Sequence, residues 1–114
     1  MMSAFMLGNL LFAQGKQEFT IEYKNAIVKI GDKVTEAKSN NYVTYNYQNV
    51  NGDILLDLSG TKYLFNKTSA DTSTDNYSYS SYLSNNGSVV TIFRYRDNSK
   101  AIEFNIDKFA IKLF

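Results

Sequence analysis

The chain contains no cysteine and no histidine, and these two absences remove most of the common machinery of catalysis and metal binding. Without thiols there are no disulfides, no thiolate metal sites and no cysteine nucleophile. Without imidazole the usual general base is missing, together with the ligand on which most zinc, copper and iron sites depend. We therefore expect a protein that is not an enzyme and that has no cofactor and no metal ion.

Proline and tryptophan are also absent, and neither sign of charge dominates. The absence of proline removes one obstacle to strand formation along the whole chain. The 12 Lys and Arg residues nearly balance the 11 Asp and Glu residues. Nucleic-acid-binding proteins usually carry a basic excess, so this balance argues against a nucleic-acid partner. Tyrosine and phenylalanine, by contrast, are abundant, with nine and eight residues among 114.

The first fifteen residues have no charged side chain and carry an apolar run that reaches Ala13. Ala13 and Gly15 are small residues two positions apart, as a signal peptidase site requires, and a polar sequence begins at Lys16. We predict that residues 1–15 are a secretory signal peptide, which makes the protein extracytoplasmic (secreted or periplasmic). The run is too short for a transmembrane helix, which needs about 20 apolar residues. The alternative for this segment is a buried first strand or helix.

From residue 16 onward apolar and polar residues alternate with a period of two, which is typical of half-buried strands. Phe19, Ile21 and Tyr23 form one such series, and no helical period is visible. A chain of this length folds as one domain. We therefore predict a single all-β domain over residues 16–114, an antiparallel meander of about seven to nine short strands. Such a meander closes into a small barrel or folds into a two-layer sandwich. The polar stretch at residues 66–76 is predicted to be a mobile surface loop.

Asn-Gly pairs at residues 51–52 and 86–87 predict two hairpins, because a type I′ turn needs positive φ at both central positions. A four-residue turn at residues 97–100 predicts a third. The expected cross-strand pairs are Tyr47 with Leu56, Tyr45 with Leu58, Tyr77 with Arg96, Tyr79 with Arg94, Phe93 with Phe104, Tyr95 with Ile102 and Arg94 with Glu103. In these registers the inward side chains are Phe93, Tyr95, Ile102, Phe104 and Ile106, and the outward ones include Arg94, Arg96 and Glu103.

The strongest candidate for a binding surface is the outward face of the second and third hairpins. Arginine presents a planar fork that binds carboxylates or phosphates and stacks on rings, and tyrosine offers faces for sugars and peptides. A binding module for a peptide, a glycan or a partner protein is the first hypothesis. Ordinary cross-strand pairing on a solvated sheet is the alternative explanation. The residues of the predicted site are Tyr77, Tyr79, Arg94, Arg96 and Glu103.

Two further functions remain open at this point. The small residues Ser78 and Ser80 are expected to face inward, which leaves space for an apolar small-molecule ligand inside a barrel. Alternatively, the protein is a structural or assembly subunit that pairs with another chain through an exposed edge strand such as residues 109–114. The alternation changes phase between Ile106 and Phe109, which indicates a bulge or a tight turn at Asp107-Lys108.

Overall fold

A computed structural model describes residues 17–97, 100–106 and 108–114, so the predicted signal peptide at residues 1–15 lies outside the described residues. These ranges are built from strands and one short 3-10 turn, η1 (Tyr47–Asn49). No helix within them is long and apolar enough to cross a membrane. The strands are β1 (Phe19–Ile30), β2 (Lys33–Tyr45), β3 (Ile54–Leu58), β4 (Thr61–Lys67), β5 (Thr72–Ser73), β6 (Tyr77–Ser84), β7 (Val89–Tyr95), β8 (Ile102–Ile106) and β9 (Phe109–Leu113).

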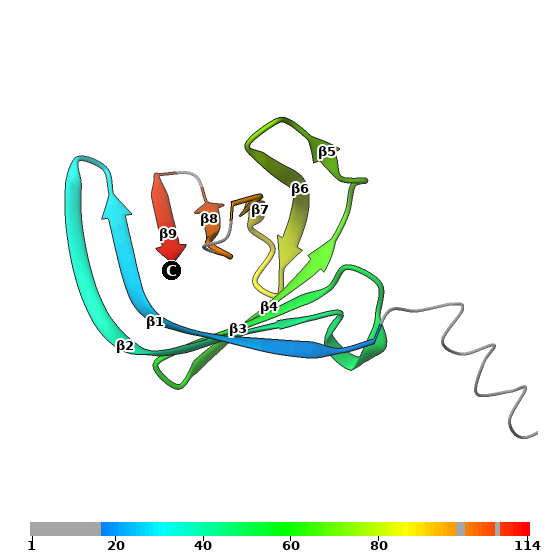
Figure 1. The fold of residues 1–114 in the computed structure, drawn as a ribbon, viewed down its shortest axis with the longest axis horizontal. Helices are drawn as coiled ribbons and strands as arrows, with labels where there is room; N and C mark the ends of the chain where they lie inside the picture. The colour runs from blue at the N-terminus through cyan, green and yellow to red at the C-terminus, as the bar shows by residue number, and fades with distance from the viewer. Residues whose placement is uncertain (1–16, 98–99, 107) are drawn as a thin grey trace, which may run out of the picture.

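The strands form a closed antiparallel barrel (Figure 1). Consecutive strands pair within the run β1 to β4 and within the run β6 to β9. Pairing of β9 with β1 and of β4 with β6 completes an eight-stranded ring, and β5 continues beside β6 where β4 ends. The all-β meander is thus confirmed, and it closes as a barrel rather than a sandwich.

The two longest strands, β1 and β2, are strongly bent (Figure 1). Their register shifts between Tyr23 and Asn25, which is the signature of a β-bulge. Before the shift β1 pairs with β2 alone, whereas from Ala26 onward it pairs with β9 as well. The bulge therefore gives β1 the bend with which it joins both sides of the ring.

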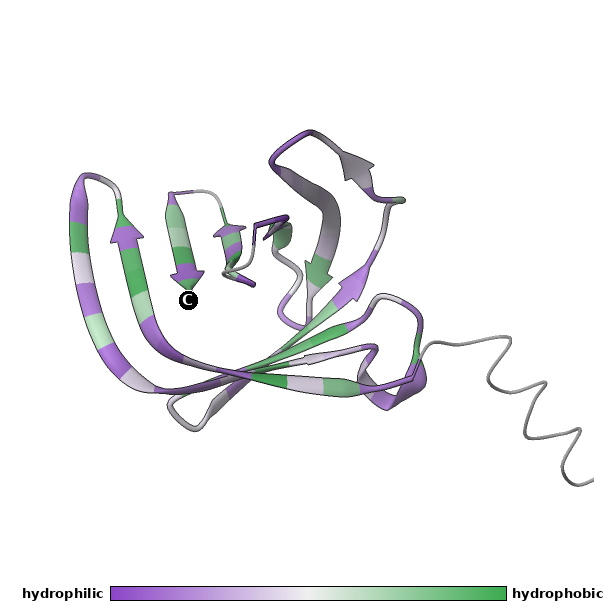
Figure 2. Cartoon of the chain, in the orientation of Figure 1, coloured by the Kyte–Doolittle hydropathy of each residue, from purple (hydrophilic) through white to green (hydrophobic). Residues whose placement is uncertain are grey.

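Inward-facing side chains fill most of the barrel. Figure 2 shows the alternation of hydrophilic and hydrophobic residues along β1 and β2 that points one set toward this interior. Phe65, Tyr82 and Phe104 are each at most 2% exposed, and the rings of Phe65 and Phe104 lie 5.4 Å apart. An eight-stranded barrel is just wide enough for its own side chains to fill it or for one small ligand to bind. Here the core cluster comprises Tyr23, Ala26, Val43, Ile54, Leu56, Phe65, Tyr82, Val90, Ile92, Ile102, Phe104, Ile111 and Leu113.

The first predicted hairpin is present, but its register differs from the prediction. A turn does form at Asn51-Gly52, with the Asp53 amide donating to the Val50 carbonyl at 3.2 Å. Of these two residues only Gly52 has a positive φ (+92°), however, so it is not the predicted type I′ turn. The additional turn η1 precedes it and moves every pairing by four residues. Because four is an even number, each residue keeps its predicted face. The observed pairs are Tyr45 with Ile54, Val43 with Leu56 and Asn41 with Leu58.

The second and third hairpins are each shifted by one residue, which corrects the predicted faces of β7. The β6–β7 loop has three residues instead of two and ends in Gly87, whose φ is +91°. The Gly87 amide donates to the Ser84 carbonyl and closes the turn. A one-residue shift moves a strand's side chains to the opposite face. Phe93 and Tyr95 therefore face outward and Arg94 faces inward, contrary to the prediction. The observed pairs are Tyr77 with Tyr95, Ser78 with Arg94, Tyr79 with Phe93, Ser80 with Ile92, Ile92 with Phe104, Phe93 with Glu103 and Arg94 with Ile102.

Two further predictions about the chain's connections had opposite outcomes. A tight turn does join β8 to β9, since Ile106 pairs directly with Phe109, although Asp107 itself lies outside the described residues. The stretch 66–76, in contrast, is hydrogen-bonded to β6 over part of its length, through Lys67 of β4, the Thr68 amide and β5. The predicted mobile loop was wrong there, because a partner strand lies alongside it.

Candidate functional site

The structure does not bring the five predicted site residues together on one face of the barrel wall. Tyr77, Tyr79 and Glu103 face outward, as predicted, because they lie directly across from outward residues of β7. Arg94 faces inward, opposite Ser78 and Ile102. Arg96 follows the end of β7 and donates from its guanidinium to the Thr74 carbonyl at 2.9 Å. The predicted aromatic and arginine surface therefore does not form as one site.

The outward group is enlarged by the two rings that the one-residue shift turns to the outside. We call Tyr77, Tyr79, Phe93 and Tyr95 the outer aromatic patch. Its ring centroids lie 5.4 Å apart for Tyr77 and Phe93, 5.4 Å for Tyr79 and Phe93, 5.9 Å for Tyr77 and Tyr79, and 6.1 Å for Tyr77 and Tyr95. All four rings are partly exposed. Tyr77 contacts the other three rings, so the four form one continuous aromatic patch on the outer sheet face, where scattered single apolar residues are the norm.

Polar side chains of β8 and β9 border the outer aromatic patch. The Glu103 carboxylate accepts hydrogen bonds from the Asn105 amide at 2.9 Å and from the Tyr95 hydroxyl at 3.4 Å. Burial and this carboxylate raise the pKa of Tyr95, so its hydroxyl stays protonated as a donor. The Lys112 ammonium lies 4.8 Å from the centre of the Tyr95 ring, a cation–π contact. The border thus offers an acid, an amide and an ammonium beside the rings.

The inward arginine belongs to a cluster of charges at the mouth of the barrel. Lys67 at the end of β4 and Arg94 near the end of β7 both bind one carboxylate oxygen of Asp71, at 2.8 and 3.0 Å. We call these three residues the barrel-mouth cluster. Burial of the Asp71 carboxyl acts to raise its pKa, but Lys67 and Arg94 outweigh this effect and hold the pKa below its ordinary value. Asp71 therefore remains a carboxylate.

Three tyrosines lie inside the barrel near this cluster. The Tyr23 hydroxyl donates to the Lys100 carbonyl at 2.5 Å. The pKa of Tyr45 is raised, mainly because the side chain is buried and also because the Tyr23 hydroxyl lies beside it. Tyr82 is 1% exposed, and its hydroxyl has no hydrogen-bond partner among the described residues. A buried hydroxyl without a partner calls for a specific explanation, such as water or a ligand. The mouth end of the interior is therefore polar, in contrast to the apolar centre.

Sequence reasoning missed Asp71 and two rings of the patch. Asp71 was assigned to a mobile loop, and no local signal connects it with Arg94, since β4, the loop and β7 meet only when the barrel closes. Phe93 and Tyr95 were assigned to the core because the hairpin loop was taken to be one residue shorter. Among the described residues, no group of three Asp or Glu side chains is arranged to hold a metal ion.

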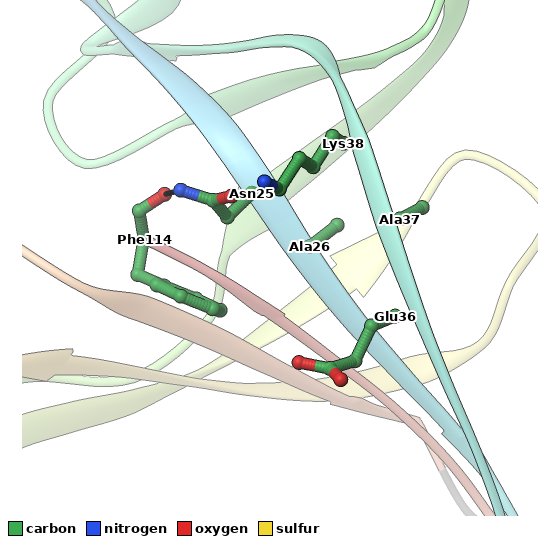
Figure 3. Close-up of a pocket in the computed structure, with 6 residues that line it drawn as sticks. All are labelled: Asn25, Ala26, Glu36, Ala37, Lys38 and Phe114. Atoms are coloured by element: carbon green, nitrogen blue, oxygen red, sulfur yellow. Dashed lines mark hydrogen bonds between the residues drawn. The ribbon is translucent and has the colours of Figure 1, made fainter.

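Three pockets on the described part of the barrel differ in the character of their lining. One of about 250 Å³ lies at the barrel mouth, lined by Phe19, Tyr45, Asn46, Asn51, Gly52, Lys67, Asp71 and Arg94. A second, of about 140 Å³, is mostly apolar and includes Leu56, Phe65, Phe104, Ile106, Phe109 and Ile111. The third, of about 230 Å³, lies between the β1–β2 hairpin and the end of β9 (Figure 3), with Asn25, Ala26, Glu36, Ala37, Lys38 and Phe114 around it.

The pocket of Figure 3 is explained by the fold alone. Asn25 and Phe114 exchange backbone hydrogen bonds of 3.1 Å at the point where β1 and β9 begin to pair. The Asn25 amide also donates to the Phe114 carbonyl at 3.4 Å. Its two charged residues, Glu36 and Lys38, are exposed and of opposite sign. This pocket therefore mixes one acid and one base with apolar side chains and offers no net charge of its lining side chains to a ligand.

Comparison with known proteins gives no relative for this barrel. The chain matches no family model, no curated protein and no solved structure. Its function must therefore be inferred from the geometry of its own sites.

Proposed function

We propose that the protein is a non-enzymatic binding module whose contact surface is the outer aromatic patch and whose partner is a neutral polysaccharide. The observation that carries this proposal is the packing of four partly exposed rings on adjacent strands, with ring centroids 5.4–6.1 Å apart. The axial C–H groups of a sugar ring form an apolar face that packs on aromatic rings. The Glu103 carboxylate and the Asn105 amide beside the rings match sugar hydroxyls.

The surroundings of the patch favour a saccharide over an extended peptide. A peptide that adds a strand to a sheet needs a free edge with unpaired amides and carbonyls. The patch lies on β6 and β7, and β7 is paired on both sides. A partner must therefore be recognised by ring faces and side chains. The acid Glu103 lies directly across from the base Lys112, so the border favours no charged polymer.

The other two functions are less well supported by the described residues. The apolar pocket of about 140 Å³ is smaller than the roughly 300–1,000 Å³ of typical ligand sites. The strand β9, which was expected to offer an exposed edge, pairs with both β1 and β8. The proposal includes a location outside the cytoplasm, because residues 1–15 are predicted to be a secretory signal peptide.

Substitution of two patch tyrosines tests the proposal. The variant Tyr77→Ala with Tyr79→Ala is expected to weaken binding to an insoluble β-1,4-glucan by about tenfold or more, since each stacked ring contributes on the order of 1 kcal/mol. Depletion of the protein from solution by the washed polymer measures the affinity. Tyr42→Ala is the matched control, because Tyr42 is an outward tyrosine, 36% exposed, on the distant strand β2.

The outcomes separate the alternatives. The proposal is supported if the polymer binds the wild type and Tyr42→Ala but no longer binds the double variant. Equal retention of all three proteins contradicts it, and so does failure of the folded wild type to bind either the β-1,4-glucan or an α-1,4-glucan. Circular dichroism of each variant shows whether the barrel is intact.

A further inference from the structure

The barrel-mouth cluster carries one more positive than negative charge. Lys67 and Arg94 share a single carboxylate oxygen of Asp71. The nearby Asp53 makes no ion pair with either cation among the described residues. Its carboxylate accepts instead from the Asn66 amide at 2.8 Å and from the backbone amide of Lys67 at 3.0 Å. The side chains of Lys67 and Arg94 are only 21% and 30% exposed. Two partly buried cations at a pocket of about 250 Å³ favour an anionic ligand.

Two aromatic rings line the same pocket as the charges. The rings of Phe19 and Tyr45 lie 4.8 Å apart and line the same pocket as Arg94. Phe19 is 51% exposed, so its ring is accessible to a ligand. Both residues belong to the β1–β2 pair, in which they lie directly opposite each other. The pocket thus combines a cationic side with a flat apolar side.

The pocket lining includes a glycine whose nearest neighbour is the Lys67 side chain. Gly52 has φ +92°, and a Cβ atom built on it would lie 3.2 Å from the Cβ of Lys67. Asn46 holds the loop in place, because its side-chain oxygen accepts from the Gly52 amide at 3.0 Å. The glycine therefore allows the Lys67 side chain to pack directly on this loop.

We propose that the barrel mouth is a binding site for a small aromatic carboxylate, whose carboxylate pairs with Arg94 and Lys67 and whose ring packs on Phe19 and Tyr45. The proposal does not depend on the saccharide site, which lies on the outer face of the barrel wall. Arg94 offers a two-pronged donor that matches a carboxylate, and Lys67 adds a second charge. Asp71 occupies these cations in the free protein and is displaced by the ligand.

Displacement of Asp71 makes a specific prediction about affinity. Benzoate is the probe, and its binding to the full chain is measured by calorimetry. Asp71→Asn keeps the size of the side chain but removes the competing charge, so it is expected to bind benzoate about tenfold more tightly. Arg94→Gln is expected to weaken binding by about tenfold or more. Arg96→Gln, the other arginine of the chain, lies outside the pocket and is expected to leave the affinity unchanged.

The opposite results overturn the proposal. Equal affinities of Arg94→Gln and Arg96→Gln, or weaker binding by Asp71→Asn, exclude the assigned cations. If Arg94→Gln does not fold, amide shift mapping of the wild type decides the question without a variant. Benzoate-induced shifts centred on Tyr45, Gly52 and Arg94 support the site, whereas no shifts, or shifts centred elsewhere, contradict it. A mouth site that fails this test leaves the saccharide proposal unaffected, since the outer aromatic patch was not changed.

Discussion

Replacement of Phe104 by alanine is expected to lower the free energy of unfolding by about 3–5 kcal/mol. Phe104 is completely buried in the barrel interior, and its ring packs on that of Phe65 at 5.4 Å. Removal of the ring leaves a cavity that the closed barrel wall cannot collapse to fill. A domain of this size is stable by only about 5–15 kcal/mol, so a large part of its stability would be lost. Denaturant unfolding followed by circular dichroism measures the change.

Phe93→Ala is the matched control for this prediction. Phe93 lies on the outer face of the barrel wall, away from the core, where it contacts Tyr77 and Tyr79. Its truncation removes ring contacts but leaves no closed cavity, so we expect a loss of about 1–2 kcal/mol. Similar losses for the two variants would show that Phe93 is as buried as Phe104. The outer aromatic patch would then not exist.

Tyr82→Phe is expected to stabilise the protein by about 1–3 kcal/mol. The Tyr82 ring is 1% exposed, and its hydroxyl has no hydrogen-bond partner among the described residues. The buried hydroxyl has lost its hydration without a replacement, and phenylalanine removes it while keeping the ring. The same denaturant titration measures the gain.

Tyr23→Phe provides the opposite expectation at a similar site. Tyr23 is 3% exposed, and its hydroxyl donates to the Lys100 carbonyl at 2.5 Å. Loss of this bond is expected to lower the free energy of unfolding by about 1 kcal/mol and to leave the carbonyl without its donor. If both variants destabilise the protein equally, then the Tyr82 hydroxyl does have a partner, such as an ordered water. The prediction for Tyr82→Phe would then be wrong.

Much of the fold follows from the sequence, because the period-two alternation and the turn residues are local signals. The Asn51-Gly52 turn forms where it was predicted, and the insertion of η1 before it shifts the pairing by four residues. An even shift preserves the two faces of each strand, so the predicted inside and outside of β2 and β3 survive the error. Alternation determines faces more reliably than it determines partners.

The faces of β7 could not be predicted in the same way. Residues 89–93 are nearly all apolar or neutral, so neither face of β7 has a clear polarity. The partner strand β6 alternates tyrosine with serine and is weakly coloured over most of its length in Figure 2. Only loop length then determines the register, and Asn86-Gly87 is compatible with loops of two or three residues. With Gly87 in the last position of a three-residue loop, Phe93, Arg94 and Tyr95 each face the side of the sheet opposite to the predicted one.

The charged cluster depends on contacts that no local pattern contains. Lys67, Asp71 and Arg94 are brought together by the pairing of β4 with β6, which closes the barrel. The two serines that face inward opposite Arg94 and Ile92 were predicted correctly. They leave room for the arginine side chain, but a sequence cannot show which large residue takes that room. Tertiary closure therefore created the barrel mouth.

Both proposed sites depend on the register of β6 and β7, and ring-to-ring nuclear Overhauser contacts measure it most directly. The observed register predicts contacts of Phe93 with Tyr77 and Tyr79, whose ring centroids lie 5.4 Å from it, and of Phe104 with Phe65. It predicts none between Phe93 and Phe104, which face opposite sides of the barrel wall. A contact between Phe93 and Phe104, with none between Phe93 and Tyr79, would contradict it.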